Sequence, residues 1–420
     1  MTSKTRVRYS IVALALLINV VSYTDRACLA VAGPDIQKAF HFNPAQMGLV
    51  YSIFSVSYFL GQTPWGALAD RRGARRLVAF AVGGWSVFTA ITAAAWSFTS
   101  LLAIRFVFGG LEAALSPSIA AAFNRWVPVS ERATAFGAFL GGGRLGAALT
   151  PPIASLLILR YGWRLPFVAF GVVGLAAASA WYFWYRDRPE EHWRVSPAEL
   201  AVIRSGAAPA RLREKTRRSE LLRSSRLWCL LGVAFGATFL WQFYITWFPT
   251  YLRERRGLSV EEASFYAGLP FLFGVIANWA GGLLTDFVGQ RTDVRTARNL
   301  VGLFSLTGAA LLMSAGIWAS QPRLSAALMG LAAGSIDLYL GAAWSSATDI
   351  GGPSGGAVAG MMNAASNCAG FASPALMGWV LQASNNWDSV LLLSVATTCA
   401  AAVLWWFVNP RQEAGCECAA

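Results

Sequence analysis

The most unusual feature of this chain is a set of charged residues within long hydrophobic runs. Asp25 and Arg26 are adjacent in "NVVSYTDRACLAVAGPD", and Arg105 and Glu112 lie in "RFVFGGLEAALSPS". An acid in an apolar medium can take up and release a proton, and an arginine there can bind an anion. These four residues therefore indicate chemistry with protons and anions.

The spacing of these residues predicts how they are arranged on helices. Adjacent residues point about 100° apart, so Asp25 and Arg26 cannot share one direction, and at least one should find its partner on another helix. Arg105 and Glu112 share one helix face about 10.5 Å apart along the axis, so we expect them to line one cavity without a direct bridge. Two alternatives stay open. The charges can be ion pairs that only fix helix packing, and Arg105 can extend to the membrane surface.

The composition is that of a membrane protein. Of 420 residues, 56% are hydrophobic and 13% are charged, whereas soluble domains have about 25% charged residues. Hydrophobic runs long enough to span a bilayer recur along the chain. They cover residues 10–31, 46–68, 77–97, 99–122, 133–158, 165–186, 227–251, 264–287, 298–319, 324–348, 355–382 and 387–408. We therefore expect an all-α integral membrane protein with twelve transmembrane helices.

The positive charge is explained by membrane topology. The net charge is +13, but most lysines and arginines fall in the loops of one side of the predicted membrane. By the positive-inside rule that side is the cytoplasm, and both termini lie there. This distribution argues against nucleic-acid binding. Residues 187–226 form an Arg-rich stretch, which we interpret as a solvated cytoplasmic linker with a short amphipathic helix near 197–205. The linker separates an N-terminal six-helix bundle (1–186) from a C-terminal one with a short cytoplasmic tail (227–420).

An internal repeat relates the two predicted bundles. "GALADRRGARR" closes the second hydrophobic run of one half, and "GLLTDFVGQRT" closes the second run of the other. Glycines allow close helix approach and a tight turn, and the acid can meet a helix N-terminus or an arginine. The matched positions, which we expect to act in gating, are Gly66, Asp70, Gly73 and Arg75, and Gly282, Asp286, Gly289 and Arg291.

This repeat resembles the signature of the major facilitator superfamily. The resemblance implies two pseudo-symmetric six-helix bundles around a central cavity that opens alternately to either side. "YTDRACLAVAGP", Tyr58 in "SVSYFLGQTPWG" and "RFVFGGLEAALSP" are similar to the anion:cation symporter family, which includes transporters of sugar acids and other organic carboxylates. By that resemblance Asp25 and Glu112 carry protons, Arg26 and Tyr58 contact the anionic substrate, and Arg105 tunes the carboxylates.

Further polar residues in the hydrophobic runs are candidates for the substrate site. Some symporters of acidic sugars carry a basic residue in the seventh helix, and none is present here. Arg144 in "GGGRLGAALTPP" can replace that charge or serve helix packing. Asp337 can be a further proton site or a counterion for Arg144. The candidate hydrogen-bonding residues, each with helix packing as the alternative, are Gln242, Tyr244, Asn363 and Asn367.

The sequence thus predicts a proton-coupled importer of a small organic anion, a sugar acid or other carboxylate, in the inner membrane of a bacterium. Alternating access, a monomeric state and no cofactor are expected. Six cysteines and two histidines show no metal-binding pattern, and no nucleophile–base set or phosphate-binding loop indicates an enzyme. The alternatives are an organic-anion exchanger or exporter, and a transporter-like sensor.

Overall fold

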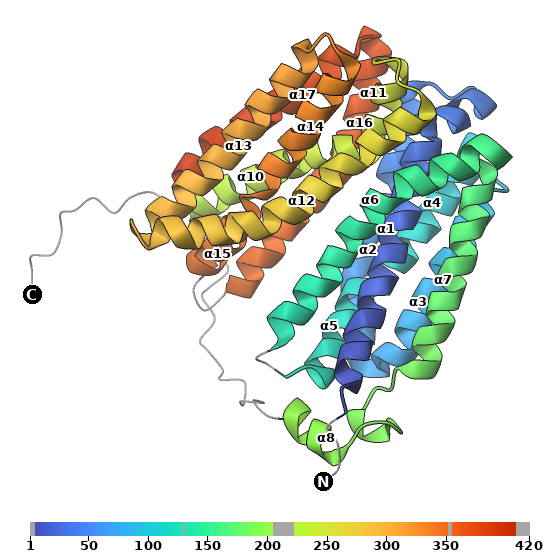
Figure 1. Ribbon diagram of the computed structural model, residues 1–420, viewed down its shortest axis with the longest axis vertical. Helices are drawn as coiled ribbons and strands as arrows, with labels where there is room; N and C mark the ends of the chain where they lie inside the picture. Colours follow the sequence, from blue (N-terminus) through green and yellow to red (C-terminus); the bar gives the residue numbers. More distant parts are fainter. Residues whose placement is uncertain (1–4, 129–130, 205–221, 352–354, 409–420) are drawn as a thin grey trace, which may run out of the picture. The chain divides into compact units, whose positions relative to one another are not determined.

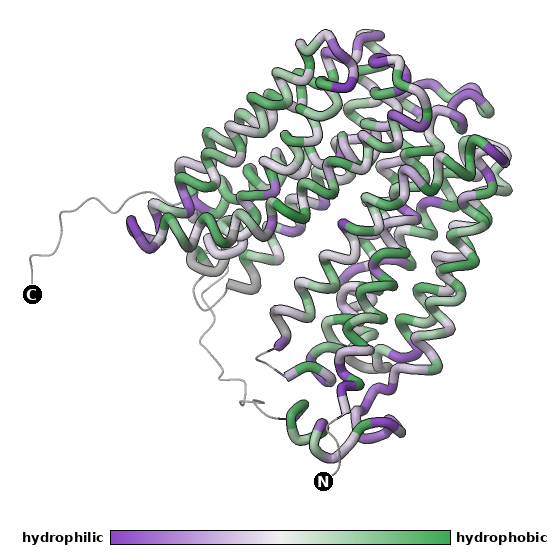
Figure 2. Tube along the Cα trace, in the orientation of Figure 1, coloured by the Kyte–Doolittle hydropathy of each residue, from purple (hydrophilic) through white to green (hydrophobic). Residues whose placement is uncertain are grey.

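The protein consists of α-helices throughout the part that the computed structural model describes, residues 5–128, 131–204, 222–351 and 355–408 (Figure 1). Hydrophobic residues cover most of the helix lengths, and hydrophilic ones gather at helix ends and loops (Figure 2). In the described residues, nine helical segments are long and apolar enough to cross a membrane. Three more helices, α2, α3 and α16, have 29, 19 and 30 residues. At about 1.5 Å per residue they are also long enough, which agrees with twelve transmembrane helices.

The helices form two compact units. Unit 1 contains residues 1–211, 245–268 and 371–386, and unit 2 contains residues 212–244, 269–370 and 387–420. These units are not the two bundles predicted from the sequence, because parts of the later helices pack with the first seven. The division at the linker stays a prediction.

Unit 1 is built around the first seven helices and a short helix of the linker. They are α1 (Val7–Phe40), α2 (Pro44–Arg72), α3 (Ala74–Thr92), α4 (Phe98–Glu112), α5 (Leu115–Trp126), α6 (Arg132–Tyr161), α7 (Arg164–Trp184) and α8 (Pro197–Arg204). Buried aromatic rings, Trp85, Phe108, Trp126 and Trp181 among them, fill the core. α11 (Phe248–Glu254) also belongs to unit 1, where Arg253 donates to Asp35 of α1 at 2.9 Å.

Close helix contact in unit 1 depends on the glycine-rich stretch of α6. A Cβ at Gly142 would meet the backbone of Leu16, and a Cβ at Gly143 would lie 2.6 Å from the ring of Tyr23. The glycines therefore let α6 approach α1 more closely than any larger residue allows. The helix that packs closely against this stretch is α1.

The first part of the linker is folded against unit 1. α8 confirms the short helix predicted near 197–205. Glu199 is fully buried and accepts hydrogen bonds from the backbone N–H groups of Val7 (3.1 Å) and Arg8 (3.0 Å), so it caps the start of α1. His192 is 3% exposed and stacks on Trp193. The prediction of a solvated connector is wrong for these residues, because a buried carboxylate satisfies amides that the helix leaves open.

Unit 2 contains all or part of the remaining helices. They are α10 (Ser225–Gln242), α12 (Val260–Gly289), α13 (Val294–Trp318), α14 (Pro322–Asp337), α15 (Leu340–Gly351), α16 (Gly355–Ser384) and α17 (Trp387–Val408). The ends of α12 and α16 lie in unit 1. Within unit 2, α13 packs against α14 and α17, and α10 packs against α17.

Three of the predicted continuous spans are broken. Ala113 and Ala114 separate α4 from α5, and Leu338 and Tyr339 separate α14 from α15. Between α10 and α11 the chain forms a widened π-helical turn at Phe243–Trp247. Such breaks free backbone groups and often mark functional positions in membrane helices. Glu112 and Asp337 are each the last residue before a break.

Candidate functional site

A buried ion pair in unit 1 brings together two of the residues singled out in the sequence. Nε of Arg26 lies 2.8 Å from Oε1 of Glu112. The glutamate side chain is fully buried, and the arginine side chain is 20% exposed. The pair joins α1 to the last residue of α4.

A serine of α1 completes the contact with the glutamate. The hydroxyl of Ser22 donates to the same Oε1 that Arg26 contacts. Ser22 and Arg26 are four residues apart and therefore lie on one face of α1, next to each other. Ser22 is 1% exposed, so this hydrogen bond is shielded from water.

Asp25 points to a different helix, as the spacing predicted. It lies against Trp85 and Thr89 of α3 and is 1% exposed. Neither carboxylate oxygen is in hydrogen-bonding geometry with a group that the structure describes. A buried carboxylate without hydrogen bonds is costly while charged, and the role of Asp25 as a proton carrier stays a prediction.

Three aromatic rings surround the guanidinium of Arg26. Its central carbon lies 4.9 Å from the ring centre of Tyr23, 4.6 Å from that of Phe54 and 4.9 Å from that of Tyr58. Cation–π attraction orients the arginine without neutralising it. Tyr58, predicted to contact substrate, is thus beside the residue predicted to bind the anion.

Arg105 belongs to the same charged cluster. It is 4% exposed and lies over the rings of Phe108 (4.3 Å) and Phe54 (5.4 Å). It is close enough to Glu112, Arg26 and Asp25 to interact with each electrostatically. This burial excludes the alternative in which Arg105 extends to the membrane surface. The structure pairs Glu112 with Arg26, and Arg105 stands as a second positive charge nearby.

Arg144 lies on α6, between glycines that contact α1. It is half-buried, and it interacts with its surroundings. Gly143 beside it supports the ring of Tyr23, which in turn packs on Arg26. A substrate-binding role for Arg144 stays a prediction. A pairing with Asp337 also stays a prediction, because Asp337 lies in unit 2.

The predicted residues of unit 2 are held by local contacts. Asp337 is 1% exposed and accepts from Nε1 of Trp241 at 2.6 Å, and it lies 3.3 Å from Nδ2 of Asn278. Tyr244 is 1% exposed and donates to the carbonyl of Met329 at 2.7 Å. Their roles in proton transfer and substrate binding remain predictions.

The other polar candidates of unit 2 are more accessible. Gln242, half-buried, is the last residue of α10. Asn363 is exposed, and the amide of Asn367 donates to the carbonyl of Asn363 at 2.9 Å. The bond between Asn367 and its own helix is the packing alternative noted from the sequence. It leaves the side chain of Asn363 available, and substrate contact by either residue stays a prediction.

The repeated motif is described in part. Gly73 joins α2 to α3 with φ +82°, and a side chain there would collide with the carboxylate of Asp187. The backbone N–H of Arg75 donates to Asp187, and its guanidinium stacks on Tyr182. Gly289 ends α12, and Arg291 stacks on Phe287. For the remaining members, the structure does not describe the surroundings. They are Gly66, Asp70, Gly282 and Asp286.

Several residues around the charges were not predicted. Ser22 could have been found from its spacing, four positions before Arg26 on the same helix face. Trp85, Thr89 and Phe54 come from other helices, and no spacing along the chain relates them to Asp25 or Arg26. Only the packing of α2 and α3 against α4 places them there.

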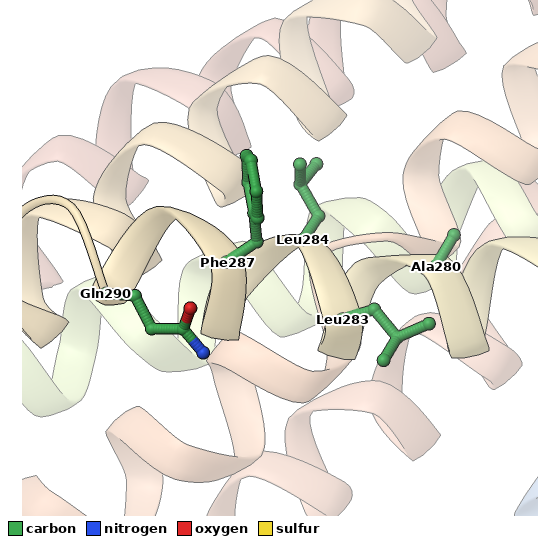
Figure 3. Close-up of a pocket in the computed structure, with 5 residues that line it drawn as sticks. All are labelled: Ala280, Leu283, Leu284, Phe287 and Gln290. Atoms are coloured by element: carbon green, nitrogen blue, oxygen red, sulfur yellow. The ribbon is translucent and has the colours of Figure 1, made fainter.

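A separate hollow of about 720 Å³ lies along α12 in unit 2. Its lining residues are Ala280, Leu283, Leu284, Phe287 and Gln290 (Figure 3). This surface is apolar and exposed, and Leu283 is 71% accessible. It offers no charge to an anion. In the described residues, no three histidine, cysteine or acidic side chains are grouped to hold a metal ion.

Comparison with known proteins identifies the family. The model of the Major Facilitator Superfamily matches residues 15–354. The chain belongs to the major facilitator superfamily. This membership confirms the resemblance seen in the sequence and makes the protein a multi-pass membrane transporter and not an enzyme.

The relatives of this superfamily member include transporters of organic anions. A probable sulfoacetate transporter of Cupriavidus necator is 31% identical over 98% of this chain and 96% of its own length. A hexuronate transporter of Bacillus subtilis is 32% identical over 91% of this chain and 90% of its own. A solved structure of a bacterial homologue of the human lysosomal transporter Spinster, inward-facing and unoccupied, has a TM-score of 0.78 at 19% identity. It covers 97% of this chain and 98% of its own, which confirms the fold.

Proposed function

We propose that this transporter imports a small organic anion together with protons across the inner membrane of a bacterium. Both termini would face the cytoplasm, as the positive-inside distribution predicts. The observation that carries the proposal is the buried pair of Arg26 and Glu112, with Asp25 and Arg105 beside it. Such a cluster contains both a cation for the substrate and acids for the protons.

The coupling follows from competition for one arginine. Without substrate, Arg26 is paired with Glu112. An entering carboxylate attracts the guanidinium, and Glu112 then loses much of the positive charge that favoured its ionisation. The glutamate takes a proton more readily, so anion and proton each favour binding of the other. Asp25, buried against α3, would carry a second proton.

The substrate is proposed to be a sugar acid or another compact carboxylate. The relatives are named for hexuronate and sulfoacetate transport, and both compounds carry a carboxylate that a guanidinium binds in a fork. Tyr58, whose ring lies beside Arg26, would add a hydrogen bond from its hydroxyl to the anion. Positive charge at this site argues against transport of lipophilic cations.

The same charges would serve an anion exchanger or exporter, and uptake into proteoliposomes separates these functions. Purified protein would be tested with radiolabelled hexuronates, sulfoacetate and simple dicarboxylates. The proposal expects at least one of these anions to accumulate inside when the outside is made acidic, and not when both sides have equal pH. Uptake that ignores the imposed gradient would contradict proton symport.

A further inference from the structure

The two oxygens of Glu112 have different surroundings. Oε1 accepts both from the hydroxyl of Ser22 and from Nε of Arg26. Oε2 is buried, and no group in the described part of the protein forms a hydrogen bond with it. The carboxylate is therefore held at one oxygen only, although the whole side chain is shielded from water.

We propose that these oxygens divide the work of coupling: Ser22 holds Oε1 throughout the cycle, and the transported proton binds at Oε2. Ser22 is thus a positioning residue for the proton carrier. This inference rests on the proposed function, because it assumes that Glu112 carries a proton.

The chemistry of the two donors supports this division. Arg26 is a cation that an anionic substrate can attract, so its contact with Glu112 is lost when substrate binds. The Ser22 hydroxyl is neutral and has no comparable attraction to an anion. It can therefore keep donating to Oε1 in both states. If Arg26 were the only donor, substrate binding would release the glutamate from its position.

The proton step is balanced in charge. Once the site opens to one side of the membrane, one O–H bond forms at Oε2 while one O–H bond of a hydronium ion breaks and leaves water, and no covalent bond in the protein breaks. Glu112 becomes neutral as the substrate anion takes its place beside Arg26. Oε1 is then the carbonyl oxygen of the acid, still an acceptor for Ser22.

Other groups near Glu112 must be separated from it in any titration. The charged or titratable side chains around it are Tyr23, Asp25, Arg26 and Cys28 of α1, Tyr58 of α2 and Arg105 of α4. On α3, Trp85 and Thr89 lie beside Asp25 and do not titrate near neutral pH. Asp25 is the one other acid of this group, and it contacts α3 and not Ser22.

The first test is the pH profile of uptake by Ser22→Ala in proteoliposomes. Losing one hydrogen bond to the charged carboxylate should raise the midpoint of this profile by about one pH unit. Ser22→Thr, which restores the hydroxyl, should return the midpoint toward that of the native protein. The matched control is Ser86→Ala, because Ser86 is also buried but bonds to the carbonyl of Val82 in its own helix. A midpoint in Ser22→Ala that equals the control would overturn the proposal.

The second test identifies the oxygen that takes the proton. In infrared difference spectra on acidification, the band that Glu112→Gln removes belongs to the protonated glutamate. If the proton is on Oε2, that band reports the C=O of Oε1, and Ser22→Ala should move it to higher wavenumber. An unmoved band would place the proton on Oε1 and contradict the inference. Failure of the proposed function is distinct, because native uptake itself would then ignore the pH gradient.

Discussion

In each unit, an acidic residue is the last residue before the break in an interrupted helix, but the two acidic residues have different hydrogen-bond partners. In unit 1, Glu112 before the α4–α5 break accepts from Ser22 and the cation Arg26, both on α1. In unit 2, Asp337 before the α14–α15 break accepts from the indole of Trp241, on the first helix after the linker. The guanidinium of Arg26 can move from Glu112 to a competing anion. The indole of Trp241 is neutral and packed, so an anion does not draw it away from Asp337.

This difference suggests a division of labour within one repeated design. In unit 1 the acid is paired with a cation, which in the proposed function exchanges Glu112 for the substrate anion. In unit 2 the acid ties α10 to α14 close to the turn at Phe243–Trp247. Variants in both units test this difference.

The largest effect is expected for Glu112→Gln. Glutamine keeps the shape and can still accept from Ser22, but it cannot take up a proton. Accumulation driven by a pH gradient should fall to an inside-to-outside ratio of about 1, while exchange of labelled for unlabelled anion continues. Both are measured in proteoliposomes. The control is Glu190→Gln, which removes a carboxylate from an exposed ion pair with Arg204. Loss of folding, instead of loss of coupling, would mean that the pair only fixes helix packing.

Arg26→Lys should weaken anion binding strongly. Lysine keeps the charge but loses the planar fork and the stacking between Tyr23, Phe54 and Tyr58. We expect the KM for uptake to rise about tenfold, which corresponds to about 1.4 kcal/mol. Arg164→Lys is the matched control, since Arg164 also stacks on a ring but is exposed. An unchanged KM in Arg26→Lys would remove Arg26 from the substrate site.

Gly143→Ala should disturb the site indirectly. The new methyl group would lie 2.6 Å from the Tyr23 ring and 3.0 Å from the amide of Asn19, so the ring under Arg26 must shift. Overpacking of this kind costs about 1–3 kcal/mol, and we expect uptake to fall several-fold. The control on the same helix is Gly137→Ala, where a methyl group meets nothing within 4 Å. Equal activity of the two variants would contradict the role given to Tyr23.

Trp241→Phe should change stability more than coupling. The substitution removes the indole N–H that donates a hydrogen bond to Asp337 and keeps most of the volume of the ring. Since one hydrogen bond to a buried carboxyl group is lost, we expect the Tm in detergent to fall by about 3 °C. The pH midpoint of uptake should stay within a few tenths of a unit. Trp228→Phe, at an exposed indole bonded to the carbonyl of Leu222, is the control. A shifted midpoint in Trp241→Phe would show that Asp337 also takes part in coupling.

The smallest effect concerns Glu199 in the linker, outside the membrane-spanning helices. Burial alone would raise the pKa of Glu199, but hydrogen bonds from the Arg8 backbone and the Thr5 hydroxyl lower it below its usual value. The stabilisation is therefore complete above the ordinary value of about 4.3 and is lost as pH falls through the lower folded value. Hydrogen exchange at the Val7 and Arg8 amides should rise over that range, and Glu199→Gln should remove the dependence. Identical pH dependence in the two proteins would contradict this cap.

The sequence predicted the helices well because hydrophobic runs of bilayer length leave few alternatives. Even the 100° divergence of Asp25 and Arg26 could be predicted, since it depends only on helix geometry. The partners of these charges could not. Glu112 was expected near Arg105 by spacing along one helix, but its bond goes to Arg26, because α4 ends beside α1. The capping of α1 by Glu199 was not predicted, because nothing in the sequence of an Arg-rich linker distinguishes one buried acid from exposed ones.

The central claim is that anion and proton enter together through the Arg26–Glu112 pair. It is tested most directly in sealed proteoliposomes with a pH indicator inside and no imposed gradient. When a transported anion is added outside, the account predicts that the interior becomes acidic as the anion enters. In Glu112→Gln vesicles it predicts no acidification. Entry of the anion into native vesicles without acidification would contradict the account.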